Sequence, residues 1–149
     1  MLDLIKRSLD AFATSDWAAF KATVAPDILY EEVATRRRTK GADELIALDK
    51  GWKAAFPDAK ATVKNFYATG DVAIAEVEWE GTHKGALEGP FGSLPATGKS
   101  VKVGAVLIHQ IKNGKIAELR HYFDVFGMLT ALGVPLAAKA TPKAERVVH

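Results

Sequence analysis

Apolar residues in the first third of the chain recur every three or four positions, which is the spacing of one face of an α-helix. Ser15-Asp16 is typical of the start of a second helix, and Pro26-Asp27 and Pro57-Asp58 are typical stops. Three helices are therefore predicted, with apolar faces at Ile5, Leu9 and Phe12, at Trp17, Phe20 and Val24, and at Leu45, Leu48, Trp52 and Phe56. A short strand over 28–33 and a turn through Arg36-Arg37-Arg38 and Gly41 separate the second helix from the third.

The rest of the chain alternates apolar and polar residues, the period of half-buried strands. Four strands are predicted, over 61–68, 72–83, 101–111 and 116–124, with a Gly- and Pro-rich loop over 84–100. Asn113-Gly114 is a strong hairpin signal, because both central residues of a type I′ turn need positive φ. A short helix over 125–131 precedes Gly133. Helices followed by antiparallel strands indicate an α+β domain.

Size and composition narrow the function classes. The chain has 149 residues, a net charge of +2 and no cysteine, so disulfides and thiolate chemistry are excluded. We expect one domain over 1–136 and a loose tail over 137–149. No apolar run approaches the roughly 20 residues of a membrane span and the N-terminus is not a signal peptide, so a cytoplasmic location is expected. The Arg36–Arg38 triplet is interpreted as a solvated loop, not a nucleic-acid surface.

The hairpin predicts which side chains share a sheet face. If Asn113-Gly114 are the two loop residues, paired numbers sum to 227, so His109 faces Glu118. The face of His109 then also carries Arg120, Tyr122 and Asp124, while His121 falls on the opposite face. That opposite face is partly apolar, and a second subunit could cover it in a symmetric homodimer.

Asp124 has two interpretations that do not exclude each other. It precedes a short helix, where Asp is a favoured N-cap. It also follows an aromatic strand, where partial burial would raise the pKa of its carboxyl and suit it to proton transfer. His83 ends a largely apolar strand face and is more often structural than functional there. No spacing supports a metal site, and no phosphate loop or nucleophile elbow is present, so no cofactor is expected.

Several short motifs occur in an order that resembles the SnoaL-like polyketide cyclase and ester cyclase group of the nuclear transport factor 2-like superfamily. They are Phe56-Pro57-Asp58, Gly70-Asp71, GTHKG over 81–85, LPATGK over 94–99, NGKIAE over 113–118, Tyr122-Phe123-Asp124 and Leu132-Gly133. The resemblance implies a cone-shaped α+β barrel, in which N-terminal helices pack on a curved antiparallel sheet around an apolar cavity. It also implies a cofactor-free aldol closure, with Asp124 as general acid and base.

These features predict a cofactor-independent small-molecule enzyme. Asp124 would abstract a proton next to a carbonyl, and His109 or Arg120 would stabilise the enolate. The expected binding residues for an apolar or aromatic molecule are His83, Tyr122, Trp52, Phe56, Trp79, Tyr30 and Trp17. Core packing is the plain alternative for most of these aromatic residues. An isomerase or hydratase, and a non-catalytic binding or dimeric module, remain alternatives on the same fold.

Overall fold

A computed structural model describes residues 1–135 of the chain, so the tail predicted from residue 137 lies outside the described residues. The helices are α1 (Leu2–Ala13), α2 (Trp17–Thr23), α3 (Ala42–Ala55) and α4 (Val125–Ala131). The strands are β1 (Val24–Glu32), β2 (Arg37–Lys40), β3 (Lys60–Thr69), β4 (Val72–Thr82), β5 (Leu87–Gly89), β6 (Gly92–Leu94), β7 (Ser100–Lys112) and β8 (Lys115–Phe123). The three opening helices and the four long strands agree with the predicted elements. No helix within residues 1–135 is both long and apolar enough to cross a membrane.

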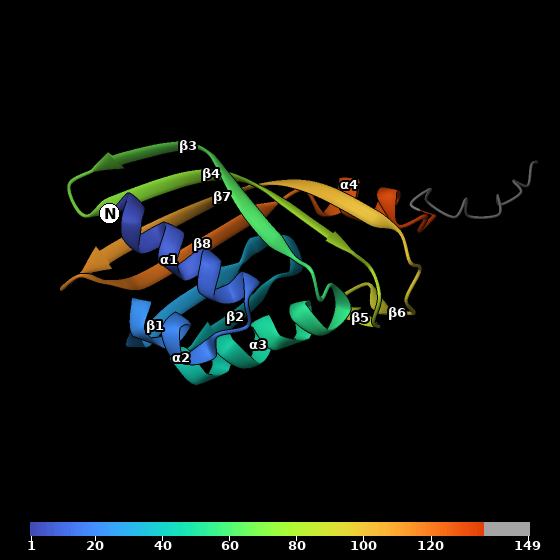
Figure 1. Ribbon diagram of the computed structural model, residues 1–149, viewed down its shortest axis with the longest axis horizontal. Coiled ribbons are helices and arrows are strands. Elements are labelled where there is room, and N and C mark those ends of the chain that lie inside the picture. Colours follow the sequence, from blue (N-terminus) through green and yellow to red (C-terminus); the bar gives the residue numbers. More distant parts are fainter. Residues whose placement is uncertain (136–149) are drawn as a thin grey trace, which may run out of the picture.

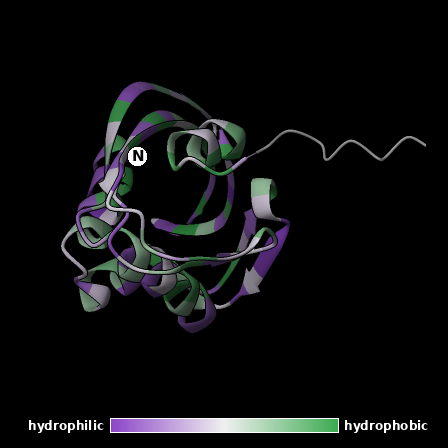
Figure 2. Ribbon diagram, turned by 90° about the vertical axis from the view of Figure 1, so that its right-hand side faces the viewer, coloured by the Kyte–Doolittle hydropathy of each residue, from purple (hydrophilic) through white to green (hydrophobic). Residues whose placement is uncertain are grey.

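Six strands form one curved sheet in the order β2-β1-β8-β7-β4-β3, and β5 and β6 form a separate hairpin. The sheet bends around the helices (Figures 1 and 2) and stays open, with β2 and β3 as its edges. This confirms the α+β fold and its cone shape, with an open sheet in place of a closed barrel. The expectation of a purely antiparallel sheet is wrong at one place, because β1 and β8 pair in parallel. Parallel neighbours need a long connection, so no local turn signal could have indicated this pair.

Helix α1 lies in the hollow of the sheet (Figure 1) and packs through Ile5 and Leu9. Opposite it, Ala73 and Ala75 of β4 are fully buried. Their small side chains allow the helix to approach the sheet closely. A second apolar cluster joins α2, α3 and α4 to β1 and β7. The helices therefore cover one face of the sheet only, and the space between them holds the cavity described below.

Helix α3 is held in place by a buried lysine. Nζ of Lys53, whose side chain is almost fully buried, donates to the carbonyl oxygens of Ala13, Pro57 and Ala59 at 2.9, 2.7 and 3.2 Å. One ammonium group thus ties the end of α1 to α3 and to the loop after α3. Burial lowers the pKa of Lys53, but the three acceptors satisfy its protons. The end of α3 that faces the cavity is fixed by this contact.

The segment before α3 differs from the prediction. Strand β1 begins at Val24, which was predicted to lie in the second helix, and Pro26 lies in the irregular stretch between the paired residues Val24 and Leu29. A proline is tolerated there because the missing N–H leaves no ladder partner unsatisfied. The arginine triplet, predicted as a turn, contains the start of β2, which pairs antiparallel with β1. Arg36 makes the reversal with a left-handed φ of 58°.

The β7–β8 hairpin begins as predicted and then changes register. Asn113 and Gly114 have φ of 51° and 73°, which confirms the type I′ turn. The ladder shifts between Ile111↔Ile116 and Gln110↔Glu118, so Ala117 is an extra residue. Beyond it the predicted register is wrong by one residue, and His109 faces Leu119. A bulge of this kind exchanges the two faces of the strand that carries it.

Candidate functional site

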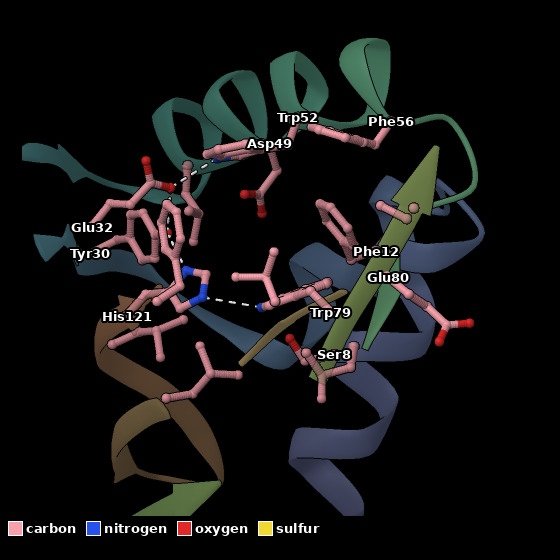
Figure 3. A pocket seen from close by; sticks show the side chains of 18 of the residues that line it. Ser8, Phe12, Tyr30, Glu32, Asp49, Trp52, Phe56, Trp79, Glu80 and His121 are labelled. Carbon is pink, nitrogen blue, oxygen red and sulfur yellow. Dashed lines mark hydrogen bonds between the residues drawn. The ribbon is translucent and has the colours of Figure 1, made fainter. Parts of the chain in front are cut away.

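A cavity of about 110 Å³ lies between the inner face of the sheet and helices α1 and α3 (Figure 3). Its walls are mainly apolar, and the aromatic residues among them are Phe12, Phe20, Trp52, Phe56, Trp79 and Phe123. The polar residues that line it are Ser8, Tyr30, Glu32, Asp49, Glu80, His109 and His121. Of these, Glu80 points away from the centre in Figure 3. A few polar groups in an apolar pocket are typical of small-molecule sites.

Glu32, the last residue of β1, is fully buried. Its Oε1 accepts from Thr35 Oγ1 at 2.5 Å and from Arg37 Nη2 at 2.6 Å. Its Oε2 accepts from Trp52 Nε1 and Tyr30 Oη, both at 2.9 Å. Burial alone would raise the pKa of this carboxyl, but these donors and the charge of Arg37 outweigh burial and lower the pKa. Glu32 is therefore a fixed anion at neutral pH.

The hydrogen bonds continue from Glu32 to β8 and β4. Tyr30 Oη lies 3.1 Å from Nδ1 of His121, and Trp79 Nε1 donates to Nε2 of His121 at 3.1 Å (dashed in Figure 3). Burial, followed by the charge of Glu32, raises the pKa of the Tyr30 hydroxyl well above its usual value. Burial lowers the pKa of His121 to about 4, although Glu32 opposes this change. At neutral pH both groups are therefore uncharged.

Asp49 projects from α3 into the cavity (Figure 3), and its carboxyl group differs from that of Glu32 in its hydrogen bonds. Its side chain makes no hydrogen bond with any part of the chain that the structure describes, and the residue is half-buried. Burial, and then the charge of Glu32, raise the pKa of Asp49 well above the usual range, and Arg37 offsets this only in part. The cavity thus holds two carboxyl groups whose surroundings push their pKa values in opposite directions. Such pairs are typical of acid–base sites.

His109 on β7 is a second neutral imidazole at the cavity wall. Its Nδ1 lies 3.2 Å from the carbonyl oxygen of Ala73, which can only accept, so Nδ1 carries the proton. Burial lowers the pKa of His109 to about 4. The ring therefore presents Nε2 as a hydrogen-bond acceptor. From the opposite wall, the buried Ser8 of α1 adds a hydroxyl group.

Of the ten residues predicted for the site, five line the cavity. They are Tyr30, Trp52, Phe56, Trp79 and His109. Trp17 packs edge-on against Phe12 and Phe20 without reaching the cavity. His83 also lies outside the lining. It is fully buried, accepts from Thr97 N at 3.2 Å through Nδ1, and stacks on Phe56 at 5.2 Å, which agrees with the structural interpretation.

The remaining three predicted residues are placed away from the cavity. Arg120 and Tyr122 are exposed on the outer face of β8, because the bulge at Ala117 turns them outward. Asp124 is also exposed, and its Oδ1 accepts from Gly127 N at 2.8 Å as the N-cap of α4. The expected position of Asp124 in the pocket is therefore wrong, and its geometry supports the capping role.

Sequence reasoning missed Asp49, Glu32 and His121, although two of them left a signal. Asp49 occupies the helix stripe of Leu45, Trp52 and Phe56, at spacings of four and three, so a carboxyl was visible on a buried face. Glu32 shares a strand face with Tyr30 by simple alternation. His121 was assigned to the outer face only because the bulge could not be foreseen. Within residues 1–135 no three His, Asp or Glu side chains are grouped so as to hold a metal ion.

Solved structures with this fold share little sequence with the chain. One is a SnoaL-like polyketide cyclase candidate from Jannaschia sp. CCS1, with 20% identity and a TM-score of 0.79, covering 90% of this chain and 92% of that one. Another is IdmH from Streptomyces antibioticus, a candidate polyketide cyclase, with 24% identity, a TM-score of 0.75 and coverage of 89% and 97%. A third, from Catenulispora acidiphila DSM 44928, has a ketosteroid isomerase-like fold, with 18% identity, a TM-score of 0.75 and coverage of 89% and 93%.

These likenesses establish the fold and agree with the motif order of the sequence. No curated protein matches the chain significantly. The family described as SnoaL-like polyketide cyclase matches residues 3–132, which is most of the chain. With that match and the ketosteroid isomerase-like architecture, the chain belongs to the SnoaL-like polyketide cyclase family.

Proposed function

We propose that the protein is a cofactor-independent acid–base enzyme that closes a ring in a small apolar carbonyl compound. One observation carries the proposal: Asp49, a carboxyl group without a protein partner in the described chain, faces an aromatic cavity beside the fixed anion Glu32. A carboxyl whose pKa is raised towards neutrality can both accept and donate a proton near physiological pH. The family membership supports a cyclase-like reaction at this site.

The proposed reaction is an intramolecular aldol closure. Ionised Asp49 takes a proton from the carbon next to a carbonyl, and the enolate carbon then attacks a second carbonyl of the same molecule. The alkoxide so formed takes the proton back from Asp49, which balances charge and atoms without a further reactant. Asp49 can hold this proton beside the alkoxide because its carboxyl group is half-buried among mainly apolar walls.

Ser8 is the group proposed to stabilise the enolate oxygen, because its hydroxyl can donate into the cavity. The neutral ring of His109 offers only a lone pair there, so it suits a hydroxyl group of the ligand better than an enolate. Arg120 lies on the outer face and does not enter the mechanism. The ligand is not expected to be an anion, because the described lining contains carboxyl groups and no lysine or arginine. An apolar cavity of about 150 Å³ holds benzene, so this one encloses roughly one ring at a time.

Replacement of Asp49 by asparagine tests the proposal. The probe is deuterium exchange at the carbon next to the carbonyl of an uncharged cyclic monoketone such as cyclohexanone, followed by NMR. Its uncatalysed exchange at neutral pH is slow, so catalysed exchange reports proton abstraction without knowledge of the natural substrate. Loss of the general base is expected to reduce catalysed exchange by about 10²–10⁴-fold. Far-ultraviolet circular dichroism should show an unchanged fold, since the Asp49 side chain makes no hydrogen bond within residues 1–135.

Asp124→Asn is the matched control, because it makes the same chemical change in the cap of α4. It should keep the exchange activity and lose about 1 kcal/mol of stability or less. If Asp124→Asn abolishes exchange and Asp49→Asn does not, the acid–base role belongs to Asp124. Ligand binding by the wild type without any exchange of its acidic protons would favour the non-catalytic binder.

A further inference from the structure

The indole of Trp79 indicates which nitrogen of His121 carries the proton. An indole N–H can only donate, and Trp79 Nε1 donates to His121 Nε2 at 3.1 Å. Nε2 must therefore hold a lone pair. His121 is buried and uncharged at neutral pH, so its single ring proton lies on Nδ1.

The same reasoning gives a direction to the rest of the chain of hydrogen bonds. Nδ1–H of His121 donates to the oxygen of Tyr30 at 3.1 Å. That leaves the hydroxyl proton of Tyr30 to donate to Oε2 of Glu32 at 2.9 Å. Each link permits one orientation only, so the bonds run from Trp79 through His121 and Tyr30 to Glu32.

Glu32 ends this series with its carboxylate fully engaged. It accepts from Thr35, Arg37 and Trp52 as well as from Tyr30. Every one of these groups donates, so none of them can take up a proton from the cavity. The groups that act electrostatically on Asp49 are Glu32 from β1, which disfavours its ionisation, and Arg37 from β2, which favours it.

We propose that Trp79, His121 and Tyr30 are positioning residues that form a one-directional hydrogen-bond relay, which fixes His121 as the tautomer protonated on Nδ1 and holds the Tyr30 hydroxyl on Glu32. Because each of its hydrogens is committed to a neighbour, the relay transfers no proton to the ligand. The proposal concerns the tautomer of His121 and can be tested without turnover.

The tautomer is measured by NMR on the full chain with ¹⁵N-labelled histidine, in which coupling to the ring carbon protons distinguishes a protonated from an unprotonated ring nitrogen. Two other histidines are internal references. His109 must carry its proton on Nδ1, opposite the carbonyl of Ala73, and neutral His83 must carry it on Nε2, because its Nδ1 accepts from Thr97 N. His121 should match His109 at neutral pH. A spectrum in which it matches His83, or is doubly protonated, overturns the relay.

Trp79→Phe removes the indole donor to Nε2 and keeps an aromatic ring at this position. Nδ1 of His121 should stay protonated, because Tyr30 donates to Glu32, while the Nε2 signal should shift because its hydrogen bond is lost. Trp52→Phe is the matched control, because it also removes an indole N–H from the cavity but one that donates to Glu32. It should leave the His121 signals unchanged. If Trp79→Phe also leaves them unchanged, the assignment of Trp79 is wrong.

Discussion

The buried histidines give the protein a defined sensitivity to acid. His109 and His121 are almost fully buried, and burial lowers the pKa of each from 6.5 to about 4. Between these two values the unfolded chain binds protons that the folded chain does not. The stability that both residues contribute is therefore complete above pH 6.5 and is lost as the pH falls towards 4. Glu32 acts in the same direction at lower pH, because its pKa is lowered as well.

Urea unfolding at a series of pH values between 7 and 4.5 should show this loss. The free energy of unfolding is expected to fall by at most on the order of 3 kcal/mol for each histidine. His109→Gln should flatten the pH dependence, because it removes one of the two groups. Asp49 acts in the opposite sense, since its pKa is raised, so Asp49→Asn should steepen the fall. A stability that rises on acidification would contradict the neutral state of both rings.

The bulge in β8 decides which side chains reach the site. Without Ala117, the residues of β7 and β8 would pair throughout in the register predicted from the Asn113-Gly114 turn. The sequence indicated this turn but not the bulge. Alanine has no bulge signature of its own, so nothing local predicted that His121 faces inward. The cause lies in the packing of Ile116 together with Leu119 and Phe123 on one face of the strand.

Two single-residue deletions separate the role of the bulge from that of the register. Deletion of Ala117 joins ladder pairs that already match on both sides, so the fold should survive with a loss of about 1 kcal/mol. Deletion of exposed Arg120 cannot restore a continuous register. The side chains on one side of the deletion must change sheet face, so either Glu118 turns into the core or His121 turns out of it. The expected loss is more than about 4 kcal/mol. Thermal unfolding of both variants provides the comparison. Equal losses of stability would show that the bulge itself, and not the register of β8, determines the stability.

The sequence predicted the positions of helices and strands better than it predicted which polar residues line the cavity. Helical periodicity located α1, α2 and α3, and alternation located the four long strands, because both patterns are local. The parallel pairing of β1 with β8 depends on contacts nearly ninety residues apart, so it left no local signal. Asp49 was passed over because Leu48 beside it also fits the apolar stripe of α3, and only the structure shows that the carboxyl faces the cavity.

In the part of the chain that the structure describes, no helix packs on the outer face of the sheet, which leaves this face available to a partner. Ile74 and Ile108 lie side by side on β4 and β7, and Tyr67 on β3 continues their row. Leu29, Tyr67 and Tyr122 are 46%, 56% and 42% exposed. A sheet face with this many apolar side chains is typical of an interaction surface. We therefore expect a homodimer, formed by this face with its own copy.

Light scattering coupled to size-exclusion chromatography tests the dimer. The wild type should elute with twice the mass of the chain, and Ile108→Glu should shift it to the monomer by placing a charge at the centre of the face. Lys102→Gln is the control, since it lies on the same face of the same strand near its other end and changes the net charge equally. A monomeric wild type at micromolar concentration would rule out the interface.

Two of the three tryptophans place their indole N–H groups in the cavity wall, while Trp17 packs outside it. Indole emission responds to the polarity of its surroundings and to the loss of a hydrogen bond. The protein therefore carries its own optical reporter, with one reference fluorophore that a ligand does not touch. Screening of compounds by intrinsic fluorescence, with Trp52→Phe and Trp79→Phe to locate the signal, can begin before any substrate is known.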